Sequence, residues 1–197
     1  MNARPRGDAR WELQGKRALV TGAAVGIGQG IAVELASRGA NVVVHHAGSD
    51  PAETLSLLAA VGHSGGASIQ ADLARAEECE RLIEEATTRL GGLDVLINNA
   101  GISIEKPIEA IGPDEFDAVF GVNVRAVYLC TRAAIPALAA DGGGSVVNLS
   151  SVHAFAGLPP SALYAASKGA INSMTRTIAM ELVDRRIRVN AVGPGLI

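Results

Sequence analysis

The chain has 197 residues, of which 48% are apolar and 19% are charged, and its formal net charge is −3. This balance excludes a disordered chain, and the lack of a dense lysine and arginine cluster argues against a dedicated nucleic-acid binder. The length suits one domain, which we expect to span residues 15–197 after a flexible N-terminal extension of residues 1–14.

Neither a targeting segment nor a membrane segment is expected. The arginines of the first ten residues have no apolar stretch behind them, which is unlike a signal peptide, and we find no apolar run long enough to cross a bilayer. Cys79 and Cys130 match no metal motif, and we interpret both as buried apolar residues in a reducing cytoplasm. We therefore expect a cytoplasmic protein that binds neither a membrane nor a nucleic acid.

The first half of the chain alternates short apolar runs with helical stretches. The predicted elements are a strand at Arg17–Val20, a helix at Ile27–Arg38, a strand at Asn41–His45, a helix from Pro51 to about Val61 and a strand at Ala67–Gln70. Proline suits a first helical position because its fixed φ matches the helix and its missing N–H would be unpaired there.

The second half repeats the alternation. Its predicted elements are a helix at Ala76–Leu90, a strand at Val95–Ile97, one long helical region at Pro113–Ala140, a strand at Gly144–Leu149, a helix at Ala162–Val183 and a strand at Arg188–Val192. Such repeated alternation predicts an α/β fold, with a doubly wound parallel sheet and helices on both faces. Ligands of these sheets bind at the carboxyl ends of the strands, where the motifs described next fall.

Three glycines follow the first predicted strand, in the turn Thr21-Gly22-Ala23-Ala24-Val25-Gly26-Ile27-Gly28. Glycine lets the backbone approach a pyrophosphate, and the following helix N-terminus offers free N–H groups and a favourable dipole. The alternative is a tight turn that needs glycine only for its shape. The strand before the turn and the helix after it favour a dinucleotide.

The end of the second strand bears on the choice between NAD and NADP. A carboxylate there would bind the ribose 2′-hydroxyl of NAD, but His45 and His46 are followed by no carboxylate before Asp50. No arginine stands there to pair with a 2′-phosphate, so NADP is favoured only slightly over NAD. Adjacent strand residues point to opposite faces, which predicts one buried and one solvated histidine and no metal site.

Two further strand ends carry polar residues. Asp72 could accept a hydrogen bond from the adenine amino group, or it could cap the next helix, and its position favours neither interpretation. Asn98-Asn99-Ala100-Gly101 follows the fourth strand, where small residues leave room for a cofactor and amide side chains can fix the loop. The alternative is a plain turn, in which asparagine and glycine are common.

The candidate catalytic residues are Asn123, Ser151, Tyr164 and Lys168. Tyr164 and Lys168 lie four residues apart on one predicted helix face, where the ammonium favours the phenolate needed for acid–base work. Ser151 follows a strand and could bind a substrate oxygen, while Asn123 could hold a water on a proton path to Lys168. Each feature alone occurs by chance, and only their joint occurrence predicts catalysis.

Together these motifs resemble those of the short-chain dehydrogenase/reductase family, from Thr21 to Gly195. They are Thr21-Gly22-x-x-x-Gly26-Ile27-Gly28, Asp72, Asn98-Asn99-Ala100-Gly101, Asn123, Ser151, Tyr164-x-x-x-Lys168 and Pro194-Gly195. The resemblance implies a Rossmann-type fold, a homotetramer and an NAD(P)-dependent oxidoreductase acting on a small-molecule alcohol or carbonyl compound. It implies cofactor contacts at Thr21, Gly22, Gly26, Ile27, Gly28, His46, Asp72, Leu73, Asn99, Ala100, Gly101, Tyr164, Lys168, Pro194 and Gly195.

The resemblance also implies roles for the catalytic residues. Ser151 positions the substrate oxygen, Tyr164 passes the proton, and Lys168 supports the phenolate and holds the nicotinamide ribose. The stretches around Ser151, Tyr164 and Pro194 resemble the glucose 1-dehydrogenases, whereas residues 40–48 resemble the 3-oxoacyl-carrier-protein reductases equally well. A sugar, a 3-oxoacyl compound and a generic alcohol therefore all stay open as substrates. His153 is expected to be a loop residue, with a hydrogen bond to a polyol as the alternative.

Family members continue beyond the position of Ile197 with a substrate-covering loop, further helices and a last strand, so we expect the C-terminal elements to be absent from this chain. A non-catalytic dinucleotide-binding module is therefore kept as the alternative function. A sugar-nucleotide epimerase of related fold is disfavoured by the short chain and by the spacing of the glycine turn.

Overall fold

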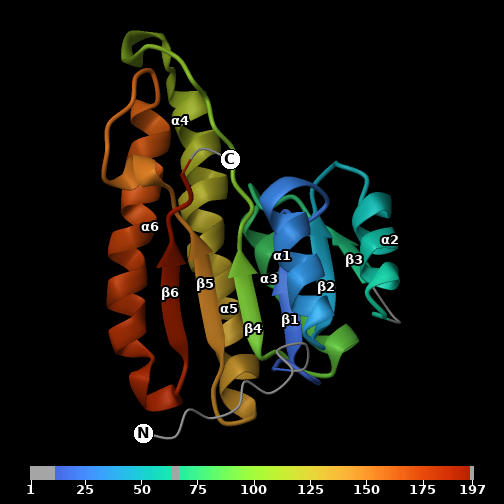
Figure 1. Cartoon of the computed structure of the whole chain (residues 1–197). Helices are drawn as coiled ribbons and strands as arrows, with labels where there is room; N and C mark the ends of the chain where they lie inside the picture. Colours follow the sequence, from blue (N-terminus) through green and yellow to red (C-terminus); the bar gives the residue numbers. More distant parts are fainter. Residues whose placement is uncertain (1–11, 64–66, 196–197) are drawn as a thin grey trace, which may run out of the picture.

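A parallel six-stranded sheet forms the centre of the structure, a computed structural model that describes residues 12–63 and 67–195 (Figure 1). The strands are β1 (Arg17–Val20), β2 (Asn41–His46), β3 (Ala67–Gln70), β4 (Val95–Asn98), β5 (Ser145–Leu149) and β6 (Arg188–Val192). All six were predicted, and only β2, β4 and β5 differ, by one residue at one end. Residues 1–11 of the predicted flexible extension lie outside the described residues.

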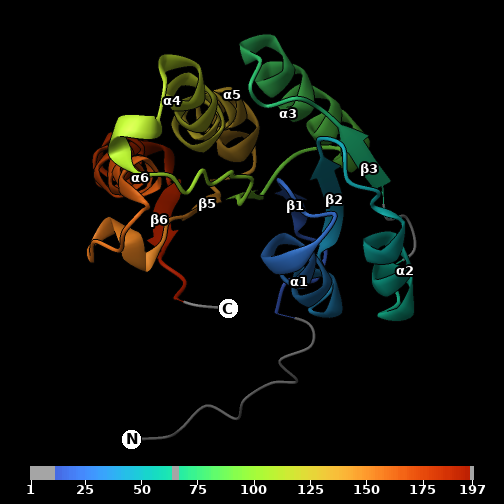
Figure 2. The same cartoon turned by 90° about the horizontal axis from the view of Figure 1, so that it is seen from above.

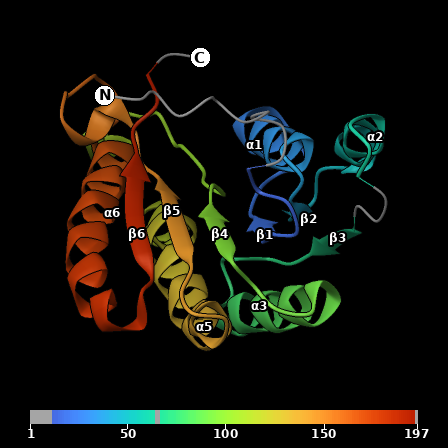
Figure 3. The same ribbon diagram turned by 60° about the horizontal axis from the view of Figure 1, so that its bottom comes forward.

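The strand order is β3-β2-β1-β4-β5-β6, and every neighbouring pair is parallel (Figure 3). The strands are short runs of valine, leucine and isoleucine whose interior positions are buried, as expected where both faces of a sheet are covered. The order reverses between β1 and β4. The chain therefore leaves these neighbouring strands in opposite directions, which opens a crevice at their carboxyl ends.

Helices cover the sheet on both faces (Figure 2). On one side lie α1 (Gly26–Ser37) and α2 (Ala52–Ala60), which form a core with β1 and β2. On the other side lie α3 (Ala76–Leu90), α5 (Ala126–Ala140) and α6 (Ala162–Glu181), whose buried residues form the larger core cluster. The predicted doubly wound α/β architecture is confirmed.

The predicted long helical region at Pro113–Ala140 is confirmed, but it is not α-helical throughout. The structure divides it into α4 (Pro113–Phe120), a π-helical segment at Gly121–Arg125, and α5. The π-segment contains Asn123. Its side-chain oxygen accepts a hydrogen bond from the Ile102 N–H, and its side-chain nitrogen donates to the Ile102 carbonyl oxygen. A tertiary contact of this kind explains an extra residue in the helical turn, and π-segments of this type often mark functional sites.

Smaller differences concern helix ends. Pro51 stands before the first residue of α2, because Asp50 Oδ1 accepts a hydrogen bond from the Ala52 N–H and forms the turn there. The last predicted helix ends at Glu181, and a separate 3₁₀ turn follows at Val183–Arg185.

By length and composition alone, one helical region could cross a membrane, namely Pro113–Ala140. The expectation that no apolar run is long enough was therefore wrong on that measure. However, α5 packs against α3 and the strands β4 and β5, with Cys130, Ala134 and Leu138 in the larger core cluster. We therefore interpret the apolar composition of this region as that of a core helix.

Candidate active site

The glycine turn between β1 and α1 needs glycine at several positions for different reasons. Gly22 and Gly26 have φ values of 61° and 62°, in the left-handed region that favours glycine. At Gly28 a Cβ atom would lie 2.3 Å from the Gly22 carbonyl oxygen and 2.5 Å from the Asn99 amide nitrogen. Close packing of the turn against α1 and the β4 loop therefore excludes any side chain at Gly28.

Thr21 and Asn99 lock this turn to the loop after β4. The Thr21 hydroxyl accepts hydrogen bonds from the backbone N–H groups of Asn99 (2.9 Å) and Ala100 (3.0 Å). The Asn99 amide donates to the carbonyl oxygens of Thr21 and Gly22, both at 2.9 Å. Thr21 itself is 1% exposed, so it supports the turn from beneath and does not line the pocket.

A pocket of about 540 Å³ lies over this turn. Its lining includes Gly22, Ile27, Gly28, His46, Asp72, Leu73, Asn99, Ala100 and Gly101, all predicted cofactor contacts. The N-cap residue of α1, Val25, makes no side-chain hydrogen bond to the free N–H groups of the first turn. A Cβ atom at Gly26 would meet nothing within 4 Å, so a pyrophosphate fits against the open backbone here.

The two histidines at the end of β2 have different surroundings. His45 is 2% exposed; its Nδ1 accepts a hydrogen bond from the Gly22 N–H at 3.0 Å, and its Nε2 lies 3.0 Å from the Ala71 carbonyl oxygen. Burial lowers the pKa of His45 to about 4, so the ring is neutral near pH 7 and Nε2 donates. His45 thus ties the glycine turn to the end of β3, a role that the sequence did not reveal.

His46 lines the 540 Å³ pocket over the glycine turn, which we name the dinucleotide pocket. The residue is half-buried rather than fully solvated. Its Nδ1 atom is buried and has no hydrogen-bond partner among the described residues. Ala47, Gly48 and Ser49 continue the same pocket wall, which carries no carboxylate. The described residues contain no group of three or more metal-ligating side chains.

Asp72 combines features of both predicted roles. One carboxylate oxygen accepts a hydrogen bond from the Ala74 N–H at 3.0 Å, which closes a turn before α3 begins at Ala76. The residue nevertheless lines the dinucleotide pocket beside Leu73. Asp72 is therefore a turn-forming residue that still faces the place expected for adenine.

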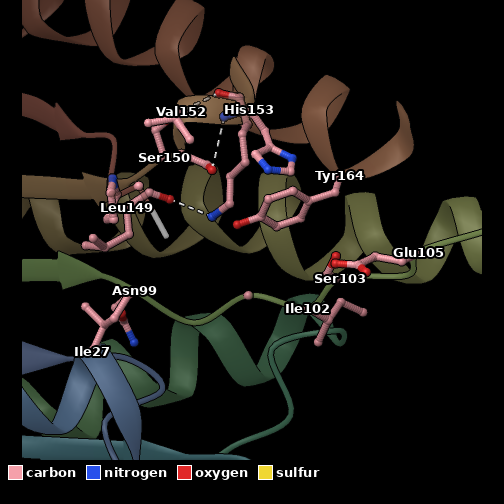
Figure 4. A pocket seen from close by; sticks show the side chains of 15 residues that line it. Ile27, Asn99, Ile102, Ser103, Glu105, Leu149, Ser150, Val152, His153 and Tyr164 are labelled. Carbon is pink, nitrogen blue, oxygen red and sulfur yellow. Dashed lines mark hydrogen bonds between the residues drawn. The ribbon is translucent and has the colours of Figure 1, made fainter. Parts of the chain in front are cut away.

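A second pocket, of about 410 Å³, adjoins the first, and both are lined by Ile27, Asn99, Gly101 and Ile102. It gathers Ser151 from the end of β5 with Tyr164 and Lys168 from α6. Pro194 and Gly195 form part of its wall, and the Pro194 carbonyl accepts a hydrogen bond from the Val152 N–H at 3.0 Å. In Figure 4, Tyr164 and His153 face Ile27 and Asn99 across this pocket.

Lys168 is held beneath Tyr164. Its Nζ donates to the Leu149 carbonyl oxygen at 2.6 Å and lies 5.5 Å from the centre of the Tyr164 ring. The lysine is 4% exposed, and this burial lowers its pKa to about 8. An ammonium with so low a pKa gives up its proton readily, which suits it to a proton path.

Ser151 and His153 belong to the short 3₁₀ turn at Val152–Ala154, which Ser151 caps, beside Tyr164. The Ser151 hydroxyl accepts a hydrogen bond from the His153 N–H at 3.2 Å, which fixes the serine at the pocket wall. The His153 ring stands edge-on to the Tyr164 ring, with 5.6 Å between ring centres. Its Nδ1 is buried and has no hydrogen-bond partner within residues 12–63 and 67–195.

Asn123 is fully buried and is not among the residues that line the 410 Å³ pocket, which we name the catalytic pocket. Its amide nitrogen donates to the Ile102 carbonyl (2.9 Å) and the Ser167 hydroxyl (3.1 Å), and its oxygen accepts from the Ile102 N–H (2.8 Å). A Cβ atom at Gly101 would lie 3.3 Å from the Asn123 oxygen and 3.6 Å from Lys168 Nζ. The bare backbone of Gly101 therefore separates Asn123 from Lys168.

Sequence analysis did not single out Ser103 and Glu105, which line the catalytic pocket from the loop after β4. Neither belongs to a helix or strand, and only the path of the loop brings them into the pocket that Tyr164 lines. Together with His153 they make this wall of the pocket polar.

Comparison with known proteins gives consistent matches. A family model described as short chain dehydrogenase matches residues 16–197. The hydroxynaphthalene reductase-like protein Arp2 of Metarhizium majus is 44% identical over 186 residues, which cover 93% of this chain and 68% of the relative. The 3-oxoacyl-(acyl-carrier-protein) reductase FabG of Staphylococcus aureus is 40% identical over 183 residues, or 92% of this chain and 74% of the relative.

Solved structures agree. A short chain dehydrogenase from Burkholderia cenocepacia, crystallised in complex with NADP, superposes with a TM-score of 0.87 at 39% identity and covers 93% of this chain and 75% of its own. The acetoin dehydrogenase YohF of Salmonella typhimurium gives a TM-score of 0.86 at 33% identity, covering 91% and 72%. The similarity therefore extends over nearly the whole chain, including both pockets.

Proposed function

The chain belongs to the short-chain dehydrogenase family, and on this premise we propose that it oxidises or reduces a hydroxylated small molecule with Tyr164 as the proton-transfer residue. It is a short-chain dehydrogenase/reductase enzyme that uses a nicotinamide dinucleotide. One observation supports the assignment of residues above all others. Ser151, Tyr164 and Lys168 line one pocket, and that pocket shares a wall with the pocket over the glycine turn.

The proposed roles follow from this arrangement. A bound nicotinamide dinucleotide supplies or accepts the hydride. The Ser151 hydroxyl, held by the His153 N–H, binds the substrate oxygen, and the Tyr164 hydroxyl exchanges a proton with it. Lys168, anchored on the Leu149 carbonyl, stabilises the phenolate of Tyr164. Asn123 holds the backbone at Ile102 and is proposed to place a water toward Lys168.

NADP is the proposed cofactor, with NAD as the alternative. The wall after β2 carries no carboxylate that would repel a 2′-phosphate. Instead it offers the imidazole of His46 and the hydroxyl of Ser49. The NADP complex of the related Burkholderia enzyme is consistent with this choice.

The polar wall of the catalytic pocket favours a hydroxylated substrate, such as a sugar, over a 3-oxoacyl compound. Ser103, Glu105 and His153 contribute hydrogen-bonding groups opposite or beside Tyr164. A hydroxyl group beside the reacting carbon can form hydrogen bonds with these side chains, whereas an acyl chain would cover them without hydrogen bonds, at a cost of about 1–3 kcal/mol for each polar group left unpaired.

The test is the change of nicotinamide absorbance with time, with NADP⁺ and NAD⁺ in parallel and the alcohol forms of the candidate substrates: aldoses, hydroxyketones and 3-hydroxyacyl thioesters. We expect turnover of aldoses and hydroxyketones, rather than of 3-hydroxyacyl thioesters, with NADP⁺. His153→Ala should raise KM about tenfold or more for these substrates without changing cofactor affinity. Phe155→Ala is the matched control, since Phe155 ends the same 3₁₀ turn and is 81% exposed.

Turnover of 3-hydroxyacyl thioesters alone, unaffected by His153→Ala, would contradict the proposed substrate class. Cofactor binding without turnover of any compound would favour the non-catalytic module instead.

A homotetramer in the cytoplasm is proposed as the native state of the enzyme. Support comes from apolar side chains that remain exposed on the helices flanking the π-segment, Phe116 of α4 and Tyr128 of α5. Sedimentation of the purified protein at micromolar concentration tests the assembly, and a monomer that retains activity would contradict it.

A further inference from the structure

A separate pocket, of about 260 Å³, lies at the amino ends of the strands, at the lower edge of the sheet in Figure 1. The beginnings of four strands meet there: Lys16 precedes β1, Asp94 precedes β4, Ser145 begins β5 and Arg188 begins β6. The pocket is smaller than the roughly 300 Å³ or more of sites for organic ligands, so it suits a small ion better. The proposed reaction uses none of these residues.

The charged side chains of this pocket are mostly positive. Its lining contains Lys16, Arg186 and Arg188, but only one carboxylate, Asp94. Asp94 is already neutralised, because Arg17 Nε lies 2.7 Å and Lys16 Nζ 3.6 Å from its oxygens. Arg186 and Arg188 are exposed and form no ion pair with residues 12–63 or 67–195. Two such guanidinium groups at one pocket create a positive potential that attracts an anion.

A glycine loop at residues 142–144, between α5 and β5, forms another part of the pocket wall. Gly142 and Gly143 have φ values of 88° and 115°, and a Cβ atom at Gly143 would lie 2.2 Å from the Arg186 carbonyl oxygen. The N–H groups of Gly143 and Gly144 donate to no acceptor within the described ranges. Free N–H groups in glycine turns are suited to bind an oxyanion.

Arg186 adopts a backbone conformation that glycine would adopt more easily. Its φ of 56° and ψ of 30° lie in the left-handed region, and no other non-glycine residue of the described ranges has a positive φ. The Arg188 N–H donates to the Gly144 carbonyl oxygen at 3.0 Å, so this strained turn is fixed against the glycine loop. Strain of this kind at a charged residue that lines a pocket suggests a use for its side chain.

We propose that Arg186 and Arg188, with Lys16 beside them, bind a small phosphate-type anion such as pyrophosphate against the glycine loop at residues 142–144. Guanidinium groups match phosphate oxygens with pairs of parallel N–H···O bonds, which favours a phosphate over a halide or a carboxylate of one charge. The anion joins the beginnings of β1 and β6 to the loop before β5. Because it binds only where these segments meet, it stabilises the folded chain.

The test is a calorimetric titration of the whole chain with pyrophosphate, at constant ionic strength and with NADP present to occupy the dinucleotide pocket. We expect one pyrophosphate per chain and an unfolding temperature that rises with pyrophosphate concentration. Arg186→Gly should weaken pyrophosphate binding at least about tenfold. The unfolding temperature of this variant without pyrophosphate should equal or exceed that of wild type, because glycine adopts the left-handed conformation without strain.

Arg185→Ala is the matched control. It removes the same charge from the neighbouring position, which does not line the pocket, so pyrophosphate affinity should stay within about threefold of wild type. Arg188→Gln is the second variant, should Arg186→Gly fail to fold, and it should also weaken binding about tenfold.

Unchanged pyrophosphate affinity in Arg186→Gly and Arg188→Gln would overturn the proposal. Equal losses in Arg185→Ala and Arg186→Gly would also overturn it, because they would indicate a diffuse effect of net charge. Binding that disappears when NADP is added would assign the anion to the dinucleotide pocket instead. None of these measurements needs turnover, so their results are independent of the proposed function.

Discussion

The two adjoining pockets are built on opposite principles. Over the glycine turn, the side chains of Thr21, Asn99 and His45 direct their hydrogen bonds at the backbone, and much of the pocket surface is bare main chain. In the catalytic pocket, the polar side chains of Tyr164 and His153 line the cavity, and Lys168 is buried beneath Tyr164. The first pocket is therefore shaped by hydrogen bonding before anything binds, whereas the second carries its chemistry in titratable groups.

This difference predicts how each pocket fails. The dinucleotide pocket should be sensitive to added volume at its glycines and insensitive to most surface charges. The catalytic pocket should be sensitive to the loss of single atoms from its side chains and to the protonation state of Lys168.

The largest effect on stability is expected for Gly28→Ala. The new methyl group would lie 2.3 Å from the Gly22 carbonyl oxygen, so the turn must shift, at a cost of about 3 kcal/mol or more in unfolding free energy. NADP affinity should fall by at least about tenfold. Gly30→Ala is the matched control two residues along the same helix, where a methyl group meets nothing and should stabilise by about 0.5–1 kcal/mol. Equal effects of the two variants on chemical denaturation and NADP titration would contradict this account.

Lys168 should make stability depend on pH in the alkaline range. The pKa of Lys168 is lowered by burial from 10.5 to about 8, so between these values the unfolded chain binds the extra proton. Stability of the wild type should therefore rise with pH across this window, by up to about 3 kcal/mol relative to Lys168→Met. Denaturant unfolding of both proteins at several pH values measures the difference, and a constant difference would contradict the burial of the ammonium.

His45 should act at the acid end of the scale. Its pKa is lowered by burial from 6.5 to about 4. Between these pH values the ring is protonated in the unfolded chain but stays neutral in the folded protein. Stability should fall as the pH drops from 6.5 to about 4, by up to about 3 kcal/mol relative to His45→Asn. Acid titration followed by circular dichroism tests this. Parallel curves for the two proteins would show that the ring is not held neutral by the Gly22 and Ala71 contacts.

The smallest effect is expected far from both pockets, at the amino ends of the strands. Arg17 binds Asp94 at 2.7 Å and Asp141 at 2.5 Å, but the Asp141 side chain is 61% exposed and that of Asp94 only 10%. Asp141→Asn should cost less than about 1 kcal/mol and leave NADP binding and turnover unchanged. Asp94→Asn is the comparison, and thermal unfolding should rank it clearly below Asp141→Asn in stability.

The sequence predicted the elements that depend on local pattern. Continuous apolar runs identified the strands, and the spacing of Tyr164 and Lys168 placed both on one helix face. Features that depend on distant partners could not be predicted. Asn123 lies in a π-helical turn of the long helical region and binds Ile102, and His45 has its partners in two separate turns.

The central claim is that Tyr164 moves the proton in a pocket where dinucleotide binding does not depend on it. The most direct test compares wild type with Tyr164→Phe, measuring nicotinamide absorbance for turnover and fluorescence titration for NADP affinity. We predict that kcat falls about 10²–10⁴-fold while NADP affinity stays within about threefold of wild type. Undiminished turnover in Tyr164→Phe would contradict the account.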